Sequence, residues 1–249
     1  MTLHLIKLAD KFSCYTRSEN EARFIYNEIF QAHEYDVATL GKAPFIIDVG
    51  ANIGLFTLYM KEKYPLAKIL AFEPAPENFE ALNRNLAFHM VATAVAYPYA
   101  LGAEAGSAPL TYFPNVPGNS TLNMEEKKCH IELFREKYSV TFADDMFGGA
   151  REIVVPVNRL SYFLDRFHSE IDVIDLLKID VEGTEMEVLG GIDDADWHKV
   201  QNIVIEVSNI KGGRDKVKEL LESKGFTVTD MAAKGIPEIF KLFIVTASR

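Results

Sequence analysis

Short apolar runs alternate with helix-like patterns along most of the chain. Each run covers a few residues, and glycine, proline or an acidic residue bounds most of them, as is typical of buried strands. Strands that alternate with helices predict a mostly parallel, doubly wound α/β sheet with helices on both faces. The predicted strands of this sheet are 45–49, 68–72, 95–101, 174–179, 203–207, 226–228 and 240–245.

The first part of the chain is predicted to lie outside the sheet. Ser18 and Glu21 have the spacing of a capping box at a helix start. Apolar residues follow with helical spacing over 22–30, which gives this helix one apolar face. We therefore expect an N-terminal helical cap over residues 1–40, followed by one domain over residues 41–249.

Residues 114–151 form the least regular segment, between two further strand-like runs at 110–113 and 153–155. The segment contains several prolines and glycines, but its aromatic residues argue against disorder. An insertion of this length in a compact domain is typically functional. We predict a lid or substrate-contacting region here, with the charged run 125–128 on a solvent-exposed helix face.

One strand-to-helix turn carries the clearest candidate chemistry. The first strand run ends at Asp48, glycines follow at Gly50 and Gly54, and a helical pattern begins directly afterwards. Glycine lets the backbone turn sharply and approach a ligand, and the free N–H groups of a helix start can then face that ligand. A dinucleotide-binding turn would need glycine where Asn52 and Leu55 stand, which disfavours NAD.

A second acid-terminated strand indicates the same site. Glu73 follows the second strand run and lies 25 residues after Asp48. In doubly wound sheets an acid near this distance accepts hydrogen bonds from a ribose, and ligands bind outside the carboxyl ends of the strands. The strand-end residues expected to converge on one crevice are Asp48, Glu73, Leu101, Asp180 and Glu206.

Composition narrows the partners and the compartment. The formal net charge is −10, whereas binding to nucleic acid needs a surplus of Lys and Arg, so we expect no nucleic-acid partner. No apolar run reaches the length of a membrane span, and the N-terminal apolar stretch is too short for a signal peptide. Cys14 and Cys129 form no metal or redox motif. We expect a cytoplasmic protein with two free thiols and no membrane partner.

Three stretches resemble the FkbM-type methyltransferases, a class I group that uses S-adenosylmethionine. They are 47–54, 71–74 and 177–185, and the last, Leu-Lys-Ile-Asp-Val-Glu-Gly-Thr-Glu, is the most specific of the three. The resemblance extends from about Pro44 to the C-terminus. It implies a seven-stranded Rossmann-like sheet whose final strand is antiparallel. It also implies methylation of a hydroxyl on a small molecule such as a polyketide, a peptide natural product or a saccharide.

The motif positions and the strand ends together assign a candidate cofactor site for S-adenosylmethionine. Some of these residues belong to the glycine turn and others end neighbouring strands. The expected cofactor-binding residues are Asp48, Gly50, Ala51, Asn52, Gly54, Glu73, Pro74, Leu101 and Asp180.

Methyl transfer to an alcohol needs aligned reactants and a base that takes the hydroxyl proton. Asp180 and Glu182 are the predicted catalytic residues, although Glu182 could instead only stabilise a helix start. A Mg²⁺ ion held by Asp180, Glu206 and Asn209 is the alternative, because oxygen ligands suit that ion; we favour a metal-free site. Lys178 is expected on the opposite face of its strand, in a structural role.

Two other functions stay open on the sequence alone. One is an NAD-dependent oxidoreductase, which the glycine pattern disfavours. The other is a catalytically inactive cofactor-binding module that has kept the fold. Binding of S-adenosylhomocysteine rather than NAD distinguishes a methyltransferase from the oxidoreductase. Turnover of an acceptor distinguishes an active methyltransferase from the inactive binding module.

Overall fold

The predicted strands assemble into a central, mostly parallel sheet. The computed structural model describes residues 2–36 and 39–249, and within them the sheet has seven strands in the order β11-β12-β10-β9-β3-β4-β5. Strands from β10 to β5 pair in parallel, whereas β12 is antiparallel to both its neighbours, so the predicted fold is confirmed. The strands are β3 (Phe45–Val49), β4 (Lys68–Phe72), β5 (Ala94–Tyr97), β9 (Leu176–Ile179), β10 (Asn202–Ser208), β11 (Thr227–Ala232) and β12 (Leu242–Ser248).

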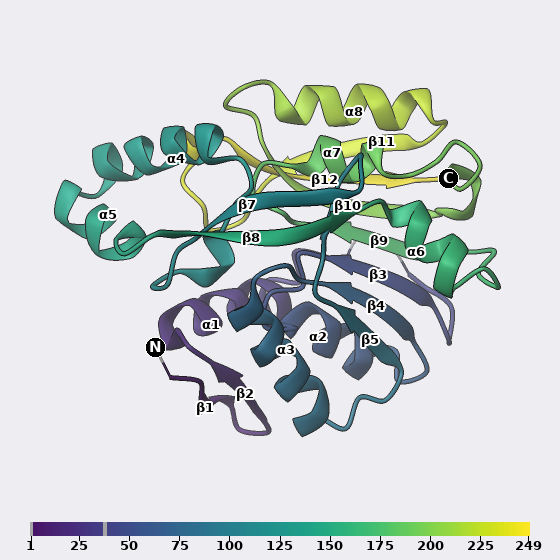
Figure 1. Cartoon of the computed structure of the whole chain (residues 1–249), viewed down its shortest axis with the longest axis horizontal. Coiled ribbons are helices and arrows are strands. Elements are labelled where there is room, and N and C mark those ends of the chain that lie inside the picture. The colour runs from purple at the N-terminus through teal and green to yellow at the C-terminus, as the bar shows by residue number, and fades with distance from the viewer. Residues whose placement is uncertain (1, 37–38) are drawn as a thin grey trace.

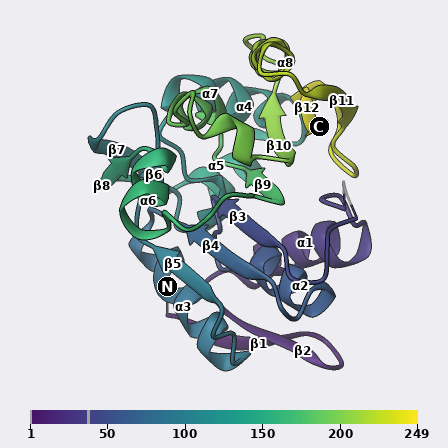
Figure 2. The same cartoon turned by 90° about the vertical axis from the view of Figure 1, so that its right-hand side faces the viewer.

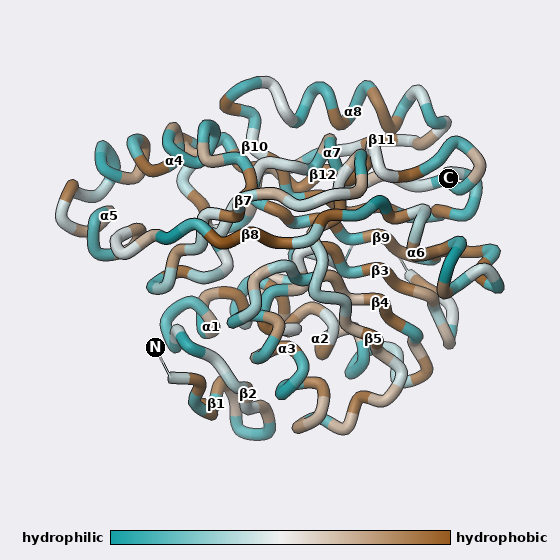
Figure 3. The backbone as a smooth tube through the Cα atoms, in the orientation of Figure 1, coloured by the Kyte–Doolittle hydropathy of each residue, from teal (hydrophilic) through white to brown (hydrophobic). Residues whose placement is uncertain are grey.

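Each central strand contributes to two hydrophobic clusters, because successive side chains of a strand point to opposite faces of the sheet. In β3, Phe45, Ile47 and Val49 belong to one cluster and Ile46 to the other. Burial on both faces explains why the strands read as continuous apolar runs rather than as alternating ones. Figure 3 shows the central strands largely in brown, whereas the colours alternate along the helices.

Helices cover both faces of the sheet (Figures 1 and 2). None of them, within the described residues, is both long and apolar enough to span a bilayer. One face carries α1 (Glu19–Tyr26), its π-helical continuation η1 (Asn27–Gln31), α2 (Leu55–Lys63) and α3 (Pro76–Phe88), and the other carries α6 (Leu160–Phe167), α7 (Glu185–Gly190) and α8 (Gly213–Ser223).

Short elements complete the sheet connections. The 3₁₀ turns η3 (Trp197–Lys199) and η4 (Glu238–Phe240) precede β10 and β12.

The N-terminal segment differs from the predicted helical cap over residues 1–40. An antiparallel hairpin of β1 (His4–Ala9) and β2 (Phe12–Thr16) precedes α1. Its strand pattern is visible in β2, where Phe12, Cys14 and Thr16 are buried and the residues between them are not. The prediction missed the hairpin because this period of two extends over only a few residues.

The residues of the expected capping box contact the segment 114–151 instead of capping α1. Ser18 precedes the helix, but its hydroxyl donates a hydrogen bond to the carbonyl of Asn115 at 3.1 Å. The Glu21 carboxylate accepts a hydrogen bond from the Gly118 N–H at 2.8 Å. The capping-box prediction is therefore wrong, because both side chains form hydrogen bonds with the backbone of the segment 114–151 instead of with that of α1.

The third predicted strand is two strands that belong to different sheets. The run 95–101 is interrupted at Pro98, which has no N–H to donate to a strand ladder. Leu101 therefore does not end a strand of the central sheet, as predicted. It belongs to a small sheet in which β8 (Arg151–Asn158) lies between β6 (Ala100–Leu101) and β7 (Gly106–Tyr112).

The segment 114–151 is regular, contrary to the prediction. It contains the 3₁₀ turn η2 (Pro117–Asn119) and the helices α4 (Met124–Lys137) and α5 (Val140–Phe147). Figure 1 shows α4 and α5 at one end of the molecule, beyond the ends of β7 and β8. The segment has a hydrophobic cluster of its own, formed by Phe113, Val116, Ile131, Ala143 and Phe147.

Candidate active site

The carboxyl ends of the parallel strands open onto a cavity of about 750 Å³. This volume lies within the range of small-molecule sites, roughly 300–1,000 Å³. The predicted site residues that line the cavity are Gly50, Ala51, Asn52, Glu73, Pro74, Leu101, Asp180, Glu182 and Glu206. Those that do not line it are Asp48, Gly54 and Asn209.

Gly50 brings the turn after β3 against the end of β9. Its φ of +76° lies in the left-handed region, which favours glycine. A Cβ atom built on Gly50 would lie 1.8 Å from the backbone oxygen of Asp180, so no side chain fits between the two strand ends. The glycine of the D-x-G pattern is therefore needed for the approach of two backbones.

Asp48 lies behind the cavity instead of in it, so the prediction that it contacts the cofactor is wrong for the side chain. The carboxylate is fully buried, accepts a hydrogen bond from the Thr57 hydroxyl at 2.7 Å and lies 3.3 Å from the ammonium of Lys178. A buried carboxylate needs such partners, because an unpaired charge is strongly disfavoured away from water. Asp48 thus acts on the site through Lys178.

Gly54 is also placed behind the cavity, at the start of α2. It has a φ of +89°, and a Cβ atom there would lie 2.6 Å from Leu82 Cδ1 of α3. The second glycine of the pattern therefore allows α2 and α3 to pack closely. Its predicted place in the cofactor-binding surface is not supported, because Gly54 does not line the cavity.

Lys178 connects the turn after β3 to the end of β9. Its ammonium donates a hydrogen bond to the Gly50 carbonyl at 2.8 Å and lies 3.4 Å from the Asp180 carboxylate. Burial disfavours its charge, but the carboxylates of Asp48 and Asp180 raise the pKa of Lys178 above its usual range. The prediction that Lys178 points away from Asp180 is wrong, because residues two apart in a strand share a face.

Glu73 connects two turns at the cavity edge. One carboxylate oxygen accepts a hydrogen bond from the Asn52 N–H and the other from the Ala75 N–H, both at 2.8 Å. Burial raises the pKa of Glu73 to about 7, although these two hydrogen bonds act in the opposite direction. Each oxygen can accept a second hydrogen bond, so the side chain can still bind ribose hydroxyls.

Three carboxylates meet on the other side of the cavity. One oxygen each of Asp180, Glu182 and Glu206 lie within 4.8 Å of one another. Burial, followed by the charge of Asp180, raises the pKa of Glu206 well above its usual range. The hydroxyl of Tyr35 lies 3.4 Å from both the Asp180 and the Glu206 carboxylates. Asp180 and Glu182, the predicted catalytic residues, thus lie together in one cluster of carboxylates.

Two lysines pair with two of these three carboxylates. Lys178 lies beside Asp180, and the ammonium of Lys127 lies 2.6 Å from the Glu182 carboxylate. The ammonium groups partly compensate the charges of Glu182 and Asp180, which a divalent cation would need as ligands. Asn209, the third residue of the predicted Mg²⁺ set, does not line the cavity. The arrangement therefore favours a metal-free site.

An apolar wall faces the three carboxylates. It is formed mainly by residues of α4 and α5, which belong to the segment 114–151, and of η4. His130 of α4 also lines the cavity, and burial followed by the charge of Lys127 lowers its pKa to about 4, so its imidazole is neutral. The aromatic residues of the wall are Phe134, Tyr138, Phe142, Phe147 and Phe240.

Sequence reasoning missed two residues of this site. Lys127 stands in the run predicted to be solvent-exposed, yet only 3% of its surface is exposed. Tyr35 precedes the first strand with no motif around it, and it is also buried. For Lys127, its helical spacing of three and seven residues from His130 and Phe134 was the available signal, since such residues share a helix face.

Comparison with known proteins gives a consistent result. The family model of the methyltransferase FkbM domain matches residues 48–228. The methyltransferase sdnD of Sordaria araneosa is 49% identical over 97% of this chain and 95% of its own length. The 31-O-demethyl-FK506 methyltransferase FkbM of Streptomyces tacrolimicus is 36% identical over 84% of this chain and 83% of its own.

A solved structure supports the fold. The crystal structure of a methyltransferase FkbM from Methylobacillus flagellatus matches with a TM-score of 0.56. The match covers 85% of this chain and 45% of that chain at 13% identity, a level at which the likeness concerns the fold alone.

The approach of Gly50 to Asp180 can be tested by substitution. Gly50→Ala should reduce the free energy of unfolding by about 1–3 kcal/mol and weaken binding of S-adenosylhomocysteine, because a Cβ atom displaces the turn. Gly225→Ala is the control, since Gly225 has a similar φ of +85° but open space around its Cβ position. Urea denaturation of both variants and calorimetric titration separate steric overlap from backbone strain. Equal effects of the two substitutions would contradict the proposed overlap.

The buried acids predict how stability depends on pH. Burial raises the pKa of Glu21 and of Glu185 to about 8, and that of Glu73 to about 7. The folded state then holds protons that an unfolded chain releases near pH 4.3. The free energy of unfolding should therefore fall as the pH rises from about 5 to about 8. Urea denaturation midpoints measured across this pH range show whether stability falls as predicted. Glu185→Gln should make the dependence of the free energy of unfolding on pH less steep.

Proposed function

Because the chain belongs to the FkbM family of S-adenosylmethionine-dependent methyltransferases, we propose that it methylates a hydroxyl group of a small molecule. One observation carries this proposal: within a single cavity, Asp180 and Glu182 face an apolar wall. An oxygen acceptor must lose a proton, so a carboxylate is useful beside it, while apolar side chains bind the carbon skeleton. The relative named 31-O-demethyl-FK506 methyltransferase is consistent with transfer to an oxygen.

We place the cofactor along the turn after β3. Asn52 lines the cavity, and its Oδ1 atom is buried without a hydrogen-bond partner among the described residues, as expected of a group that binds a ligand. Glu73 lies beside it as the ribose acceptor. Gly50, Ala51, Pro74 and Leu101 complete the surface, as the sequence predicts. When bound, S-adenosylmethionine supplies a methyl carbon activated by a sulfonium.

The protein's own residues then have three tasks. The turn and the apolar wall hold both reactants in line, and such positioning can supply much of the acceleration. The wall also excludes water from the reacting centre. Glu182 takes the hydroxyl proton on a carboxylate oxygen, while Asp180 lies beside the Lys178 ammonium near the reacting groups.

The charges around the cavity also define the acceptor. Asp180, Glu182 and Glu206 repel anions, and the facing wall is aromatic. We therefore expect an uncharged, largely apolar acceptor with a hydroxyl group, and no nucleic acid, whose phosphates would meet the acidic side. The two alternative functions raised by the sequence have no observation in their favour.

The cofactor assignment is tested by calorimetry. S-adenosylhomocysteine should bind the wild-type protein and NAD should not. Glu73→Ala removes an acceptor of charge-assisted hydrogen bonds, so affinity should fall by about 1.5–3 kcal/mol. Glu62→Ala, an exposed position of α2, is the matched control and should bind normally. Unchanged affinity in Glu73→Ala would remove Glu73 from the site. Methyl-labelled cofactor and a panel of hydroxylated polyketides, peptides and saccharides then identify the acceptor.

The metal-free mechanism is tested with the acceptor from that panel. Turnover should be the same with and without excess EDTA, since Lys127 and Lys178 compensate the carboxylates. Glu182→Gln should lower kcat by roughly 10²–10⁴-fold through loss of the base, with cofactor affinity retained. Loss of activity in EDTA with rescue by Mg²⁺ would replace this mechanism by one with a metal on Asp180 and Glu206. Full activity of Glu182→Gln would leave Asp180 as the base.

A further inference from the structure

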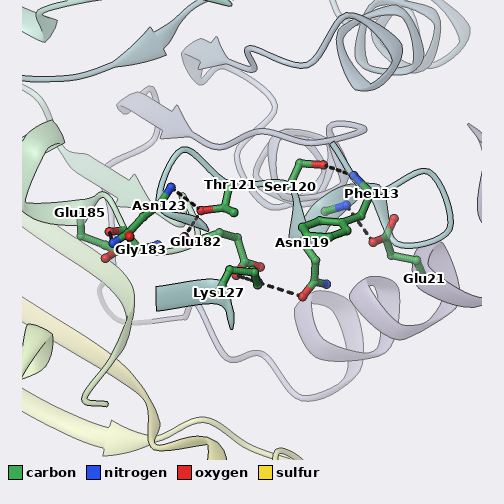
Figure 4. A network of polar contacts seen from close by, with 11 residues as sticks. Glu21, Phe113, Asn119, Ser120, Thr121, Asn123, Lys127, Glu182, Gly183 and Glu185 are labelled. Atoms are coloured by element: carbon green, nitrogen blue, oxygen red, sulfur yellow. Dashed lines mark hydrogen bonds and ion pairs between the residues drawn. The ribbon is translucent and has the colours of Figure 1, made fainter. Parts of the chain in front are cut away.

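Residues 119–127 hold Glu182 and Gly183 by several polar contacts (Figure 4). The Thr121 hydroxyl donates a hydrogen bond to the Glu182 carbonyl at 2.7 Å, and the Asn123 amide donates one to the Gly183 carbonyl at 2.9 Å. The Lys127 ammonium donates to the Glu182 carboxylate at 2.6 Å. Thr121, which precedes α4, thus contacts the backbone of Glu182, and Lys127 within α4 contacts its side chain.

The charged contact is the one that water cannot replace. Lys127 is 3% exposed, and its second polar contact is the Asn119 side-chain oxygen at 3.1 Å. A buried ammonium without a carboxylate partner would be strongly disfavoured. The helix α4 can therefore pack in this position only if the Glu182 carboxylate pairs with the Lys127 ammonium.

Glu182 depends on Lys127 in return. Its backbone has a φ of +61°, which is uncommon for a residue with a side chain and must be maintained by surrounding contacts. Apart from Lys127, the titratable groups that act on its carboxylate include five acids. They come from α1, α4, the end of β9, α7 and β10, and they are Glu21, Glu126, Asp180, Glu185 and Glu206. Two of these acids, Asp180 and Glu126, would repel the Glu182 carboxylate if Lys127 were absent.

The same face of α4 forms the apolar wall. Lys127, His130 and Phe134 are spaced as residues of one helix face, and all three line the cavity. The wall and the contact with Glu182 therefore form together when α4 docks.

We propose that Lys127 is a positioning residue for methyl transfer: it fixes the Glu182 carboxylate at the reacting centre only while α4 closes the acceptor side of the cavity. The role of Glu182 in this statement rests on the proposed function. The contact between α4 and Glu182 does not, and it can be measured without any acceptor.

The test follows hydrogen exchange of the protein bound to S-adenosylhomocysteine. Lys127→Met should speed exchange of backbone amides in 124–147 by roughly tenfold or more, because α4 loses its buried partner. Lys127→Arg, which keeps the charge, should retain most of the protection. Lys128→Met is the matched control, since Lys128 is the exposed neighbour on the same helix and should change nothing. Wild-type protection of 124–147 in Lys127→Met would overturn the proposal.

Two further comparisons address the cases in which Lys127→Met unfolds the protein and in which Lys127 has only a structural role. If Lys127→Met also loses protection in β3 and β9, the variant is unfolded in general and does not report on α4. The exchange of 124–147 is then measured in Glu182→Gln, which removes the same ion pair by changing its other partner. With an acceptor from the panel, Lys127→Met should lower kcat more than it changes KM. In the Glu182→Gln background it should lower kcat no further. An equal loss of kcat in both backgrounds would show that Lys127 acts independently of Glu182 and would overturn the proposal. Failure to bind S-adenosylhomocysteine would instead contradict the proposed function.

Discussion

Lys178 is the charge on which the geometry of the site depends. Its buried ammonium lies between the carboxylates of Asp48 and Asp180 and donates to the Gly50 carbonyl, so it joins the ends of β3 and β9. Neither the Asp48 carboxylate nor the Lys178 ammonium could be buried here without the other, because an unpaired buried charge is strongly disfavoured. Glycine at position 50 is the steric counterpart, since it lets the two strand ends meet. The turn after β3 is consequently held against β9 by charge compensation and close backbone contact together.

The same principle extends around the cavity, where acids outnumber cations. Burial raises the pKa of Glu21, Glu73, Glu185 and Glu206, so this region holds protons that water would remove. Such an arrangement lowers stability at neutral pH and is typical of a site selected for chemistry rather than for folding. A reaction that releases a proton from its acceptor is the chemistry that such a set of carboxylates suits.

The segment 114–151 links the apolar wall of the cavity to this charge balance. Its helices form a hydrophobic cluster of their own, and α4 also sends Lys127 into the acidic cluster. Contacts from α1 reinforce the attachment, since Ser18 and Glu21 bind the backbone of residues 115–118. Parts of the chain that are far apart in sequence therefore meet at the aromatic wall of the cavity, while Gly50, Glu73 and Asp180 lie at the ends of neighbouring strands.

The sequence by itself determined the sheet, because strands buried on both faces leave apolar runs that are visible without a structure. It also determined the turn at Gly50, Asn52 and Glu73 and the acids Asp180 and Glu182, since short motifs at strand ends need no distant partner. Only the tertiary structure decided that Asp48 and Gly54 lie behind the cavity, and that Lys127 is buried against Glu182. Burial and charge pairing depend on which segments meet in space, and a charged run in an isolated helix looks the same whether it faces water or a carboxylate.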